Sequence, residues 1–267
     1  MPQPWITAAT HAVADLVFPE RCALCAASTA DQAVGRRGFC FACLRDLAPF
    51  DGPRCGRCAL PRPPDASPSA EPGCPACRAE RYAFDGAWAW GPYQGALRHA
   101  VLLAKRRSGR GVAAALGEQM SVGLADLLAA DASEAPPLVA PIPSPWRRRV
   151  RRGVTPAEEI ARSLARAARL PLALGLLRTA KSPARQASVA PSDRWRNVRG
   201  AFRVSERLRR LGADRIGGSQ RLEGRTVLLV DDVLTTGATC DAAARALRKA
   251  GSGRVVAVVA ARRVGGL

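Results

Sequence analysis

Residues 226–230 form a continuous run of β-branched and leucine residues that is followed by two aspartates, a hydroxyl-rich loop and a helical pattern. Unbroken β-branched and leucine residues predict a strand that is buried on both faces of a parallel sheet. The apolar residues after the loop recur at helical spacing: Cys240, Ala243, Ala244, Leu247 and Ala250. With a last strand at 255–260, this pattern predicts a parallel β-α-β unit and therefore an α/β fold.

The end of the first strand carries groups that suit a phosphorylated sugar. Ligands of open α/β sheets bind at the carboxyl ends of the strands, which is where Asp231 and Asp232 fall. Their carboxylates can accept hydrogen bonds from sugar hydroxyls or hold a divalent cation. Residues 235–239 add backbone N–H groups, three hydroxyls and a glycine at a helix N-terminus, which favours an anion.

This segment resembles the phosphoribosyl pyrophosphate (PRPP) motif of type I phosphoribosyltransferases. The resemblance implies that Asp231 and Asp232 contact the ribose hydroxyls, and that Mg²⁺ accompanies PRPP. It also implies that five loop residues hold the 5′-phosphate: Thr235, Thr236, Gly237, Ala238 and Thr239. An ordinary α/β strand and helix is one alternative. A Walker B strand is another, but the chain has no G-x-x-x-x-G-K-[ST] sequence.

Eight of the nine cysteines form four C-x-x-C pairs: Cys22/Cys25, Cys40/Cys43, Cys55/Cys58 and Cys74/Cys77. Two such pairs can complete a tetrahedral Cys₄ zinc site, so eight sulfurs predict two sites. We expect the pairs to combine in sequential order, with interleaved pairing as the alternative. A closed Cys₄ site has no open coordination position, so both zincs would be structural.

A disulfide framework is the main alternative for these cysteines, and it needs an oxidising compartment. The N-terminal residues do not resemble an export signal, because no basic residue precedes an apolar stretch that His11 and Asp15 interrupt. A redox C-x-x-C is a further alternative, but four copies at ribbon-like spacing favour metal. We interpret the ninth cysteine, Cys240, as a small core residue.

Zinc ribbons joined to a C-terminal PRPP motif resemble the ComF family. Members carry a Pro-Val-Pro segment, for which this chain has residues 141–143, Pro-Ile-Pro. Members also carry a later series that corresponds here to Gln186, Arg194, Asn197 and Ala201-Phe202. The resemblance implies a type I phosphoribosyltransferase-like parallel sheet flanked by helices, with an N-terminal double zinc-ribbon module. We expect the module and an N-terminal helix at 1–83 and the phosphoribosyltransferase-like domain at 84–267.

Hydrophobic patterns predict the other elements of the chain. We expect helices over 5–18, 95–107, 112–128, 156–169 and 239–250, a strand or hairpin over 84–93, and strands over 138–142 and 176–179. We assign residues 181–202 to an irregular segment.

The turn that holds pyrophosphate in related transferases is altered in this chain. Arg152-Gly153 matches the family, but Val154-Thr155-Pro156 replaces the usual Phe-Asn-Gln. We assign Arg152, Gly153 and Lys105 as candidates for neutralising or holding the pyrophosphate. The altered turn makes PRPP binding and PRPP turnover two separate questions, and no residue can be named as a general base.

The chain is strongly basic, with a formal net charge of +19. Residues 1–85 contain equal numbers of basic and acidic residues, so the excess belongs to the larger domain. One dense cluster comprises Arg147, Arg148, Arg149, Arg151 and Arg152. A second comprises Lys105, Arg106, Arg107 and Arg110. Such surfaces suit a nucleic acid, although an arginine-rich composition with a solvated basic face is an equal alternative.

These observations lead to two functional hypotheses. The first is a ComF-type protein of DNA uptake or utilisation that binds PRPP or a related phosphoribosyl ligand, contacts single-stranded DNA through residues 147–151 and works with a helicase partner. The second is an active Mg²⁺-dependent phosphoribosyltransferase of nucleotide salvage. No uninterrupted apolar stretch reaches the roughly 20 residues of a membrane span, so we expect a soluble cytoplasmic protein.

Overall fold

The computed structural model describes residues 21–28, 38–63, 73–129, 131, 133, 135–144, 155–180, 195, 198, 200–206 and 222–265. Its centre is a four-stranded sheet in the order β1-β6-β5-β2, and every neighbouring pair is parallel. The strands are β1 (Gly86–Pro92), β2 (Leu138–Pro141), β5 (Val227–Leu234) and β6 (Val255–Arg262). The predicted α/β class and parallel sheet are confirmed.

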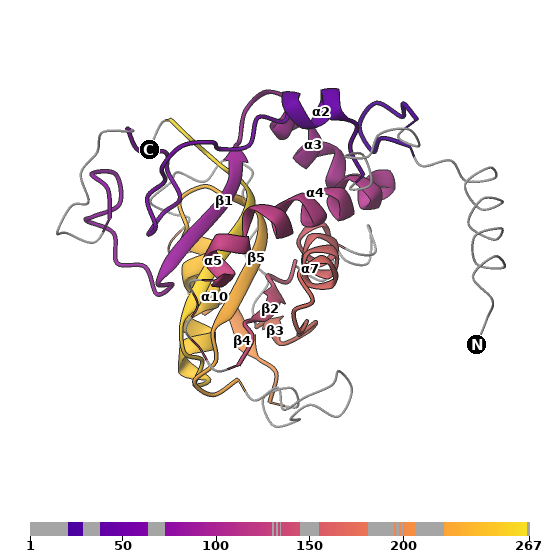
Figure 1. Cartoon of the computed structure of the whole chain (residues 1–267). Helices are drawn as coiled ribbons and strands as arrows, with labels where there is room; N and C mark the ends of the chain where they lie inside the picture. The colour runs from indigo at the N-terminus through magenta and orange to yellow at the C-terminus, as the bar shows by residue number, and fades with distance from the viewer. Residues whose placement is uncertain are drawn as a thin grey trace, which may run out of the picture.

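Helices cover both faces of this sheet (Figure 1). Alternate residues of β5 and β6 divide between two cores, so that Leu228 and Val256 face one side and Leu229 and Ala257 the other. The first side packs against α3 (Gly95–Ala104), α4 (Arg110–Gly123) and α7 (Pro156–Ala167). The second side packs against α10 (Ala238–Lys249). Burial on both faces explains the continuous apolar runs in these strands.

The predicted elements at 84–93, 95–107, 138–142, 156–169, 176–179, 239–250 and 255–260 all have counterparts, with ends that differ by a few residues. The helix expected over 112–128 is instead split into α4 and α5 (Ala125–Ala129), after the 3₁₀ helix η2 (Arg107–Gly109). Gly123 ends α4. A Cβ atom there would lie 2.8 Å from Cζ2 of Trp88, so the missing side chain makes room for that ring.

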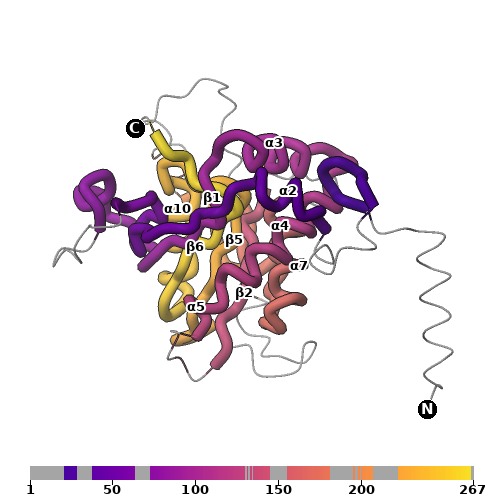
Figure 2. Tube along the Cα trace, turned by 45° about the horizontal axis from the view of Figure 1, so that its top comes forward, coloured from indigo at the N-terminus to yellow at the C-terminus, as the bar shows by residue number. Residues whose placement is uncertain are grey.

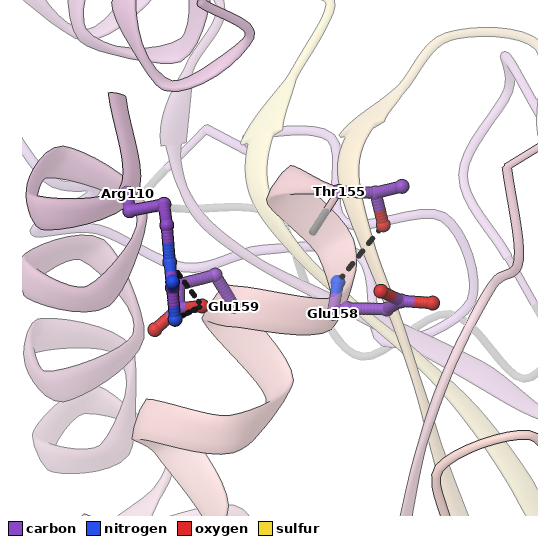
Figure 3. A network of polar contacts seen from close by, with 4 residues as sticks. All are labelled: Arg110, Thr155, Glu158 and Glu159. Atoms are coloured by element: carbon purple, nitrogen blue, oxygen red, sulfur yellow. Dashed lines mark hydrogen bonds and ion pairs between the residues drawn. The ribbon is translucent and has the colours of Figure 1, made fainter. Parts of the chain in front are cut away.

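Helix α7 begins where its sequence indicates. Thr155 is the N-cap, and its Oγ1 accepts a hydrogen bond from the Glu158 N–H at 3.4 Å (Figure 3). Glu158 and Glu159 occupy the first turn, where negative charge suits the helix dipole. Arg110 of α4 pairs with Glu159 at 3.2 Å, which ties the two helices together.

A small antiparallel sheet joins β3 (Leu177–Thr179) to β4 (Phe202–Val204). The sequence predicted the first strand but assigned the region up to Phe202 to an irregular segment. That assignment is wrong for Phe202, which pairs with Thr179. A strand of three residues is too short to show the alternation of apolar and polar side chains that identifies a strand in a sequence.

The described residues of the ribbon module, 21–28 and 38–63, lie against the larger domain (Figure 2). A short helix, α2 (Phe41–Asp46), follows the first C-x-x-C pair and contains Cys43 of the second pair. Cys22 and Cys40 belong to the same core cluster as Trp88, Trp90 and α4. The helix expected near residues 5–18 lies outside the described residues. Among the described helices, none is long and apolar enough to cross a bilayer.

Candidate functional site

Two carboxylates and a lysine meet at the carboxyl-terminal edge of the sheet. Asp231 and Asp232 lie within β5, which continues to Leu234 because Leu234 pairs with Arg262 of β6. The acids therefore stand on the strand, not after it as the sequence suggested. Lys105 follows α3 directly, and its Nζ lies 3.1 Å from Oδ2 of Asp232. The fold thus brings a predicted pyrophosphate residue to the predicted ribose residues.

The carboxyl pair holds an unusual charge state. Burial, together with the adjacent Asp232 carboxylate, raises the pKa of Asp231 to about 8. The Asp232 N–H donates to Asp231 Oδ1 at 2.8 Å, and this bond and Lys105 act in the opposite direction. Like charges so close together resist being ionised at once. The raised pKa favours the protonated form of the Asp231 carboxyl, which can donate a hydrogen bond as well as accept one.

The loop that follows the acids turns at Gly237, whose φ of +84° is left-handed. Gly237 is also the N-cap of α10 and has no side chain that could cap the helix. Thr236 Oγ1 accepts a hydrogen bond from the Ala238 N–H at 3.4 Å. Backbone N–H groups and hydroxyls at a helix N-terminus favour anions in general, and the assignment of this loop to a phosphate stays a prediction.

Replacing Gly237 with alanine is expected to distort this loop. The left-handed φ strains any L-residue, and a Cβ atom would lie only 2.9 Å from Cε1 of Tyr82. We expect a loss of about 1–2 kcal/mol in the free energy of unfolding and weaker PRPP binding, measured by denaturation and calorimetry. Gly224→Ala is the matched control, because Gly224 has a φ of +69° but open space around it. Equal effects of both substitutions on binding would contradict this assignment.

The eight paired cysteines form two compact groups, which confirms the sequential arrangement. Cys22, Cys25, Cys40 and Cys43 make the first, and Cys55, Cys58, Cys74 and Cys77 make the second, with sulfurs within 4.8 Å of one another in each. We call them ribbon 1 and ribbon 2.

The sulfur spacing fits zinc. A tetrahedron with Zn–S bonds of about 2.3 Å has sulfur–sulfur edges of about 3.8 Å. Observed separations are 3.6 Å for Cys25–Cys40, 3.7 Å for Cys55–Cys77 and 3.6 Å for Cys58–Cys74. These distances are far longer than a disulfide bond, and none of the nine cysteines forms a disulfide. Cys240 is separate and buried in the core, as expected.

Three residues at the site gave no recognisable signal in the sequence. Tyr82 donates to the Thr236 carbonyl at 3.4 Å, and its ring stacks on Phe84 with centroids 4.5 Å apart. Asp241 of α10 is buried and accepts a hydrogen bond from the Ala83 N–H at 2.7 Å. Arg262 is buried behind the loop and donates to Leu234. Each acts through a partner distant in sequence, so local patterns cannot reveal it.

Several predicted site residues lie outside the described residues. They are Arg147, Arg148, Arg149, Arg151, Arg152 and Gly153, together with Gln186, Arg194 and Asn197. Their roles stay predictions. The second basic cluster is described. Arg106 and Arg107 are exposed on the turn that leads from α3 to α4, and Arg110 is exposed at the first position of α4.

Comparison with known families agrees with both parts of this description. The phosphoribosyl transferase domain family matches residues 150–266, and the double zinc ribbon domain family matches residues 13–78. Competence protein F of Haemophilus influenzae is 24% identical over 218 residues, which are 82% of this chain and 87% of that protein. This chain is ComF-like.

Two solved structures align with just over half of this ComF-like chain. The glutamine PRPP amidotransferase of B. subtilis, complexed with ADP and GMP, is 22% identical with a TM-score of 0.34. The alignment covers 57% of this chain and only 27% of the amidotransferase. The protein TT1426 of Thermus thermophilus is 19% identical with a TM-score of 0.32, and the alignment covers 58% of this chain and 85% of that one.

Proposed function

We propose that this chain binds PRPP or a related phosphoribosyl ligand at the carboxyl-terminal edge of its sheet and acts in DNA uptake or utilisation. The observation that carries the first part is the convergence of Asp231, Asp232 and Lys105 in front of the Gly237 turn. The second part is supported by the likeness to Competence protein F. We place the protein in the cytoplasm, where thiols stay reduced for zinc.

The proposed binding mode follows from the chemistry of each group. The 5′-phosphate accepts hydrogen bonds from the backbone N–H groups and threonine hydroxyls of residues 235–239. The ribose hydroxyls lie against Asp231 and Asp232. Lys105, now paired with Asp232, can turn its ammonium group to the pyrophosphate. The acids are oxygen donors of the kind that Mg²⁺ prefers, and bound Mg²⁺ would offset pyrophosphate charge.

Calorimetry with PRPP and Mg²⁺ tests this proposal directly. We expect binding by the unmutated protein and at least about a tenfold loss of affinity in Lys105→Met, because the ligand is polyanionic. Arg166→Met is the matched control, since Arg166 is exposed and pairs with Glu118 of α4. Failure of the unmutated protein to bind PRPP would remove the phosphosugar assignment.

The basic turn beside Lys105 supports single-stranded DNA as a further partner. Arg106 and Arg107 are exposed next to the proposed ligand site. A polyanion bound there would be held mainly through its phosphates. We therefore propose that DNA runs past this turn and residues 147–151, and that a helicase partner delivers or receives it.

Salt-dependent binding of oligothymidylate tests the DNA contact. Affinity should fall steeply with salt, and the slope should become shallower when Arg106 and Arg107, or Arg147–Arg149, are changed to alanine. Arg166→Ala should keep the slope of the unmutated protein. An unchanged slope in both multiple variants would exclude these clusters as the DNA surface.

An active phosphoribosyltransferase is the second candidate, and the placement of Lys105 favours it. Loss of pyrophosphate needs a cation near the leaving group. The Lys105 ammonium lies 3.1 Å from Asp232, whose carboxylate we assign to the ribose hydroxyls. The test is pyrophosphate release from PRPP with each nucleobase in turn. Pyrophosphate release that depends on one base would establish transfer. If PRPP binds but no pyrophosphate is released with any base, the protein binds PRPP without transferring its ribose 5-phosphate.

A further inference from the structure

A loop that directs its N–H groups toward a phosphate directs carbonyl groups back into the protein, where they need donors. In this chain two side chains supply them. Arg262 Nη1 donates to the carbonyl of Leu234 at 2.9 Å and to that of Thr235 at 2.5 Å. Tyr82 donates to the carbonyl of Thr236 at 3.4 Å. Three successive carbonyls at the start of the phosphate loop are therefore held from behind.

Arg262 also reaches ribbon 2. Its Nε donates to the carbonyl of Cys58 at 2.8 Å, and the Cys58 sulfur belongs to the second cysteine group. The side chain is only 4% exposed, so these bonds are shielded from water. One buried guanidinium thus donates hydrogen bonds to the backbone of ribbon 2 and to the backbone of the phosphate loop.

The charge of Arg262 points to the same connection. Within the described part of the chain, its hydrogen-bond acceptors are carbonyls and none is a carboxylate. A buried cation needs compensation. Four thiolates around one Zn²⁺ carry a net charge of −2 on the ribbon side, and a bound phosphate would supply negative charge on the loop side.

Further contacts seat ribbon 2 against the same region. Ala59, which follows Cys58, is fully buried in the core cluster that contains Leu234. The Ala87 N–H of β1 donates to the Gly56 carbonyl at 2.9 Å. The Arg57 guanidinium lies 5.8 Å from the centre of the Tyr82 ring, and Tyr82 packs against Gly237.

Ribbon 1 lies elsewhere. Cys22 and Cys40 pack in the core cluster of α3 and α4 on the other face of the sheet, and Gly38 lies against Ala115 of α4. Among the described residues, ribbon 1 makes no hydrogen bond to residues 235–239.

We propose that ribbon 2 is a support for the phosphate loop, that Arg262 is the positioning residue that connects them, and that ribbon 1 has no such role. The identity of the bound ligand rests on the proposed function. The support itself does not, because it concerns the shape of the loop with or without ligand.

The experiment combines hydrogen exchange of peptides covering residues 234–240 with calorimetry of ribose 5-phosphate and PRPP. Arg262→Met should accelerate exchange in the loop and lower affinity about tenfold or more, because it removes the donor to the Thr235 and Cys58 carbonyls. The Leu234 carbonyl keeps its hydrogen bond from the Arg263 N–H at 3.0 Å. Arg262→Lys should give loop exchange rates and affinities between those of Arg262→Met and the unmutated protein. Arg263→Met removes an exposed neighbouring charge and should match the unmutated protein. Cys74→Ser in ribbon 2 should open the loop more than Cys25→Ser in ribbon 1.

Each outcome decides a different statement. Unchanged loop exchange in Arg262→Met, or equal loop opening from both ribbon variants, would overturn the support. If Arg262→Met does not fold, Arg262→Lys measured by hydrogen exchange gives the same comparison. If the unmutated protein binds neither ligand, the proposed function fails, while the exchange data still test the support.

Discussion

Replacing Asp231 with asparagine is expected to stabilise the protein and, in the same step, to abolish tight PRPP binding. Burial and the neighbouring Asp232 raise the pKa of Asp231 to about 8. An amide has no charge to bury, so the variant escapes this electrostatic strain. It also lacks the carboxylate that the ribose hydroxyls and Mg²⁺ require, and at least about a tenfold loss of affinity should follow.

The sign of the stability change depends on pH. An ordinary aspartate in an unfolded chain has a pKa of about 4. Between about pH 4 and pH 8 the folded protein therefore binds more protons at Asp231 than the unfolded chain does. The Asp231 contribution to the free energy of unfolding consequently falls as pH rises through this window and is constant above it.

Urea denaturation at pH 5, 7 and 9 measures this effect. The excess stability of Asp231→Asn should be smallest at pH 5 and largest at pH 9. We expect about 1 kcal/mol at pH 9, because solvent near the half-buried site relaxes part of the charge. Asp126→Asn, at an exposed position of α5, should alter neither stability nor binding. A stability difference that does not change with pH would show that Asp231 is ionised normally.

Function and stability oppose each other at this position, and that opposition is informative. A sequence selected for stability alone would not place two carboxylates side by side at the end of a buried strand. Binding sites keep such strained groups because the ligand or its cation relieves them. A measured gain in Asp231→Asn would therefore support a cationic or hydroxyl-rich ligand.

Local patterns were sufficient to predict some features of the fold and the site. The strands β5 and β6 are buried on both faces, so their apolar runs are unbroken and easy to recognise. The cysteine groups depend on pairs three residues apart, which a sequence displays directly. The Gly237 turn is equally local, because its conformation needs only a glycine at one position.

Features that depend on tertiary contacts were not predictable in the same way. Lys105 reaches Asp232 only because α3 packs over the sheet, and its candidacy came from family resemblance. The two acids lie within β5 because Leu234 pairs with Arg262, a register that neither segment reveals alone. Arg262 has no motif around it, since its partners Cys58 and Leu234 are far away in sequence.

Removing zinc from both ribbons is expected to have the largest effect on stability. Binding energy at a structural Cys₄ site is folding energy, because the unfolded chain has no preformed site. Loss of zinc should also destabilise the larger domain, because Cys22 and Cys40 share a core cluster with Trp88 and Trp90. We expect a chelator to lower the melting temperature by roughly 10 °C or more and to shift tryptophan fluorescence to the red.

The stoichiometry makes this prediction specific. Metal analysis should give one zinc for each cysteine group, hence two per chain. Cys43→Ser should remove only the ribbon 1 zinc and Cys77→Ser only the ribbon 2 zinc. Cys240→Ala is the control, because Cys240 is buried in the core outside both groups and should leave two zincs in place. Metal-free protein that melts at the same temperature would contradict the assignment.

The two ribbon variants should also differ in their spectra, which separates a structural metal from a merely bound one. Trp88 and Trp90 are 8% and 6% exposed and lie on the ribbon 1 side of the sheet. Loss of the ribbon 1 zinc should therefore shift their fluorescence more than loss of the ribbon 2 zinc. Equal shifts would mean that the domain melts as one unit with either metal, so that both ribbons belong to a single cooperative core.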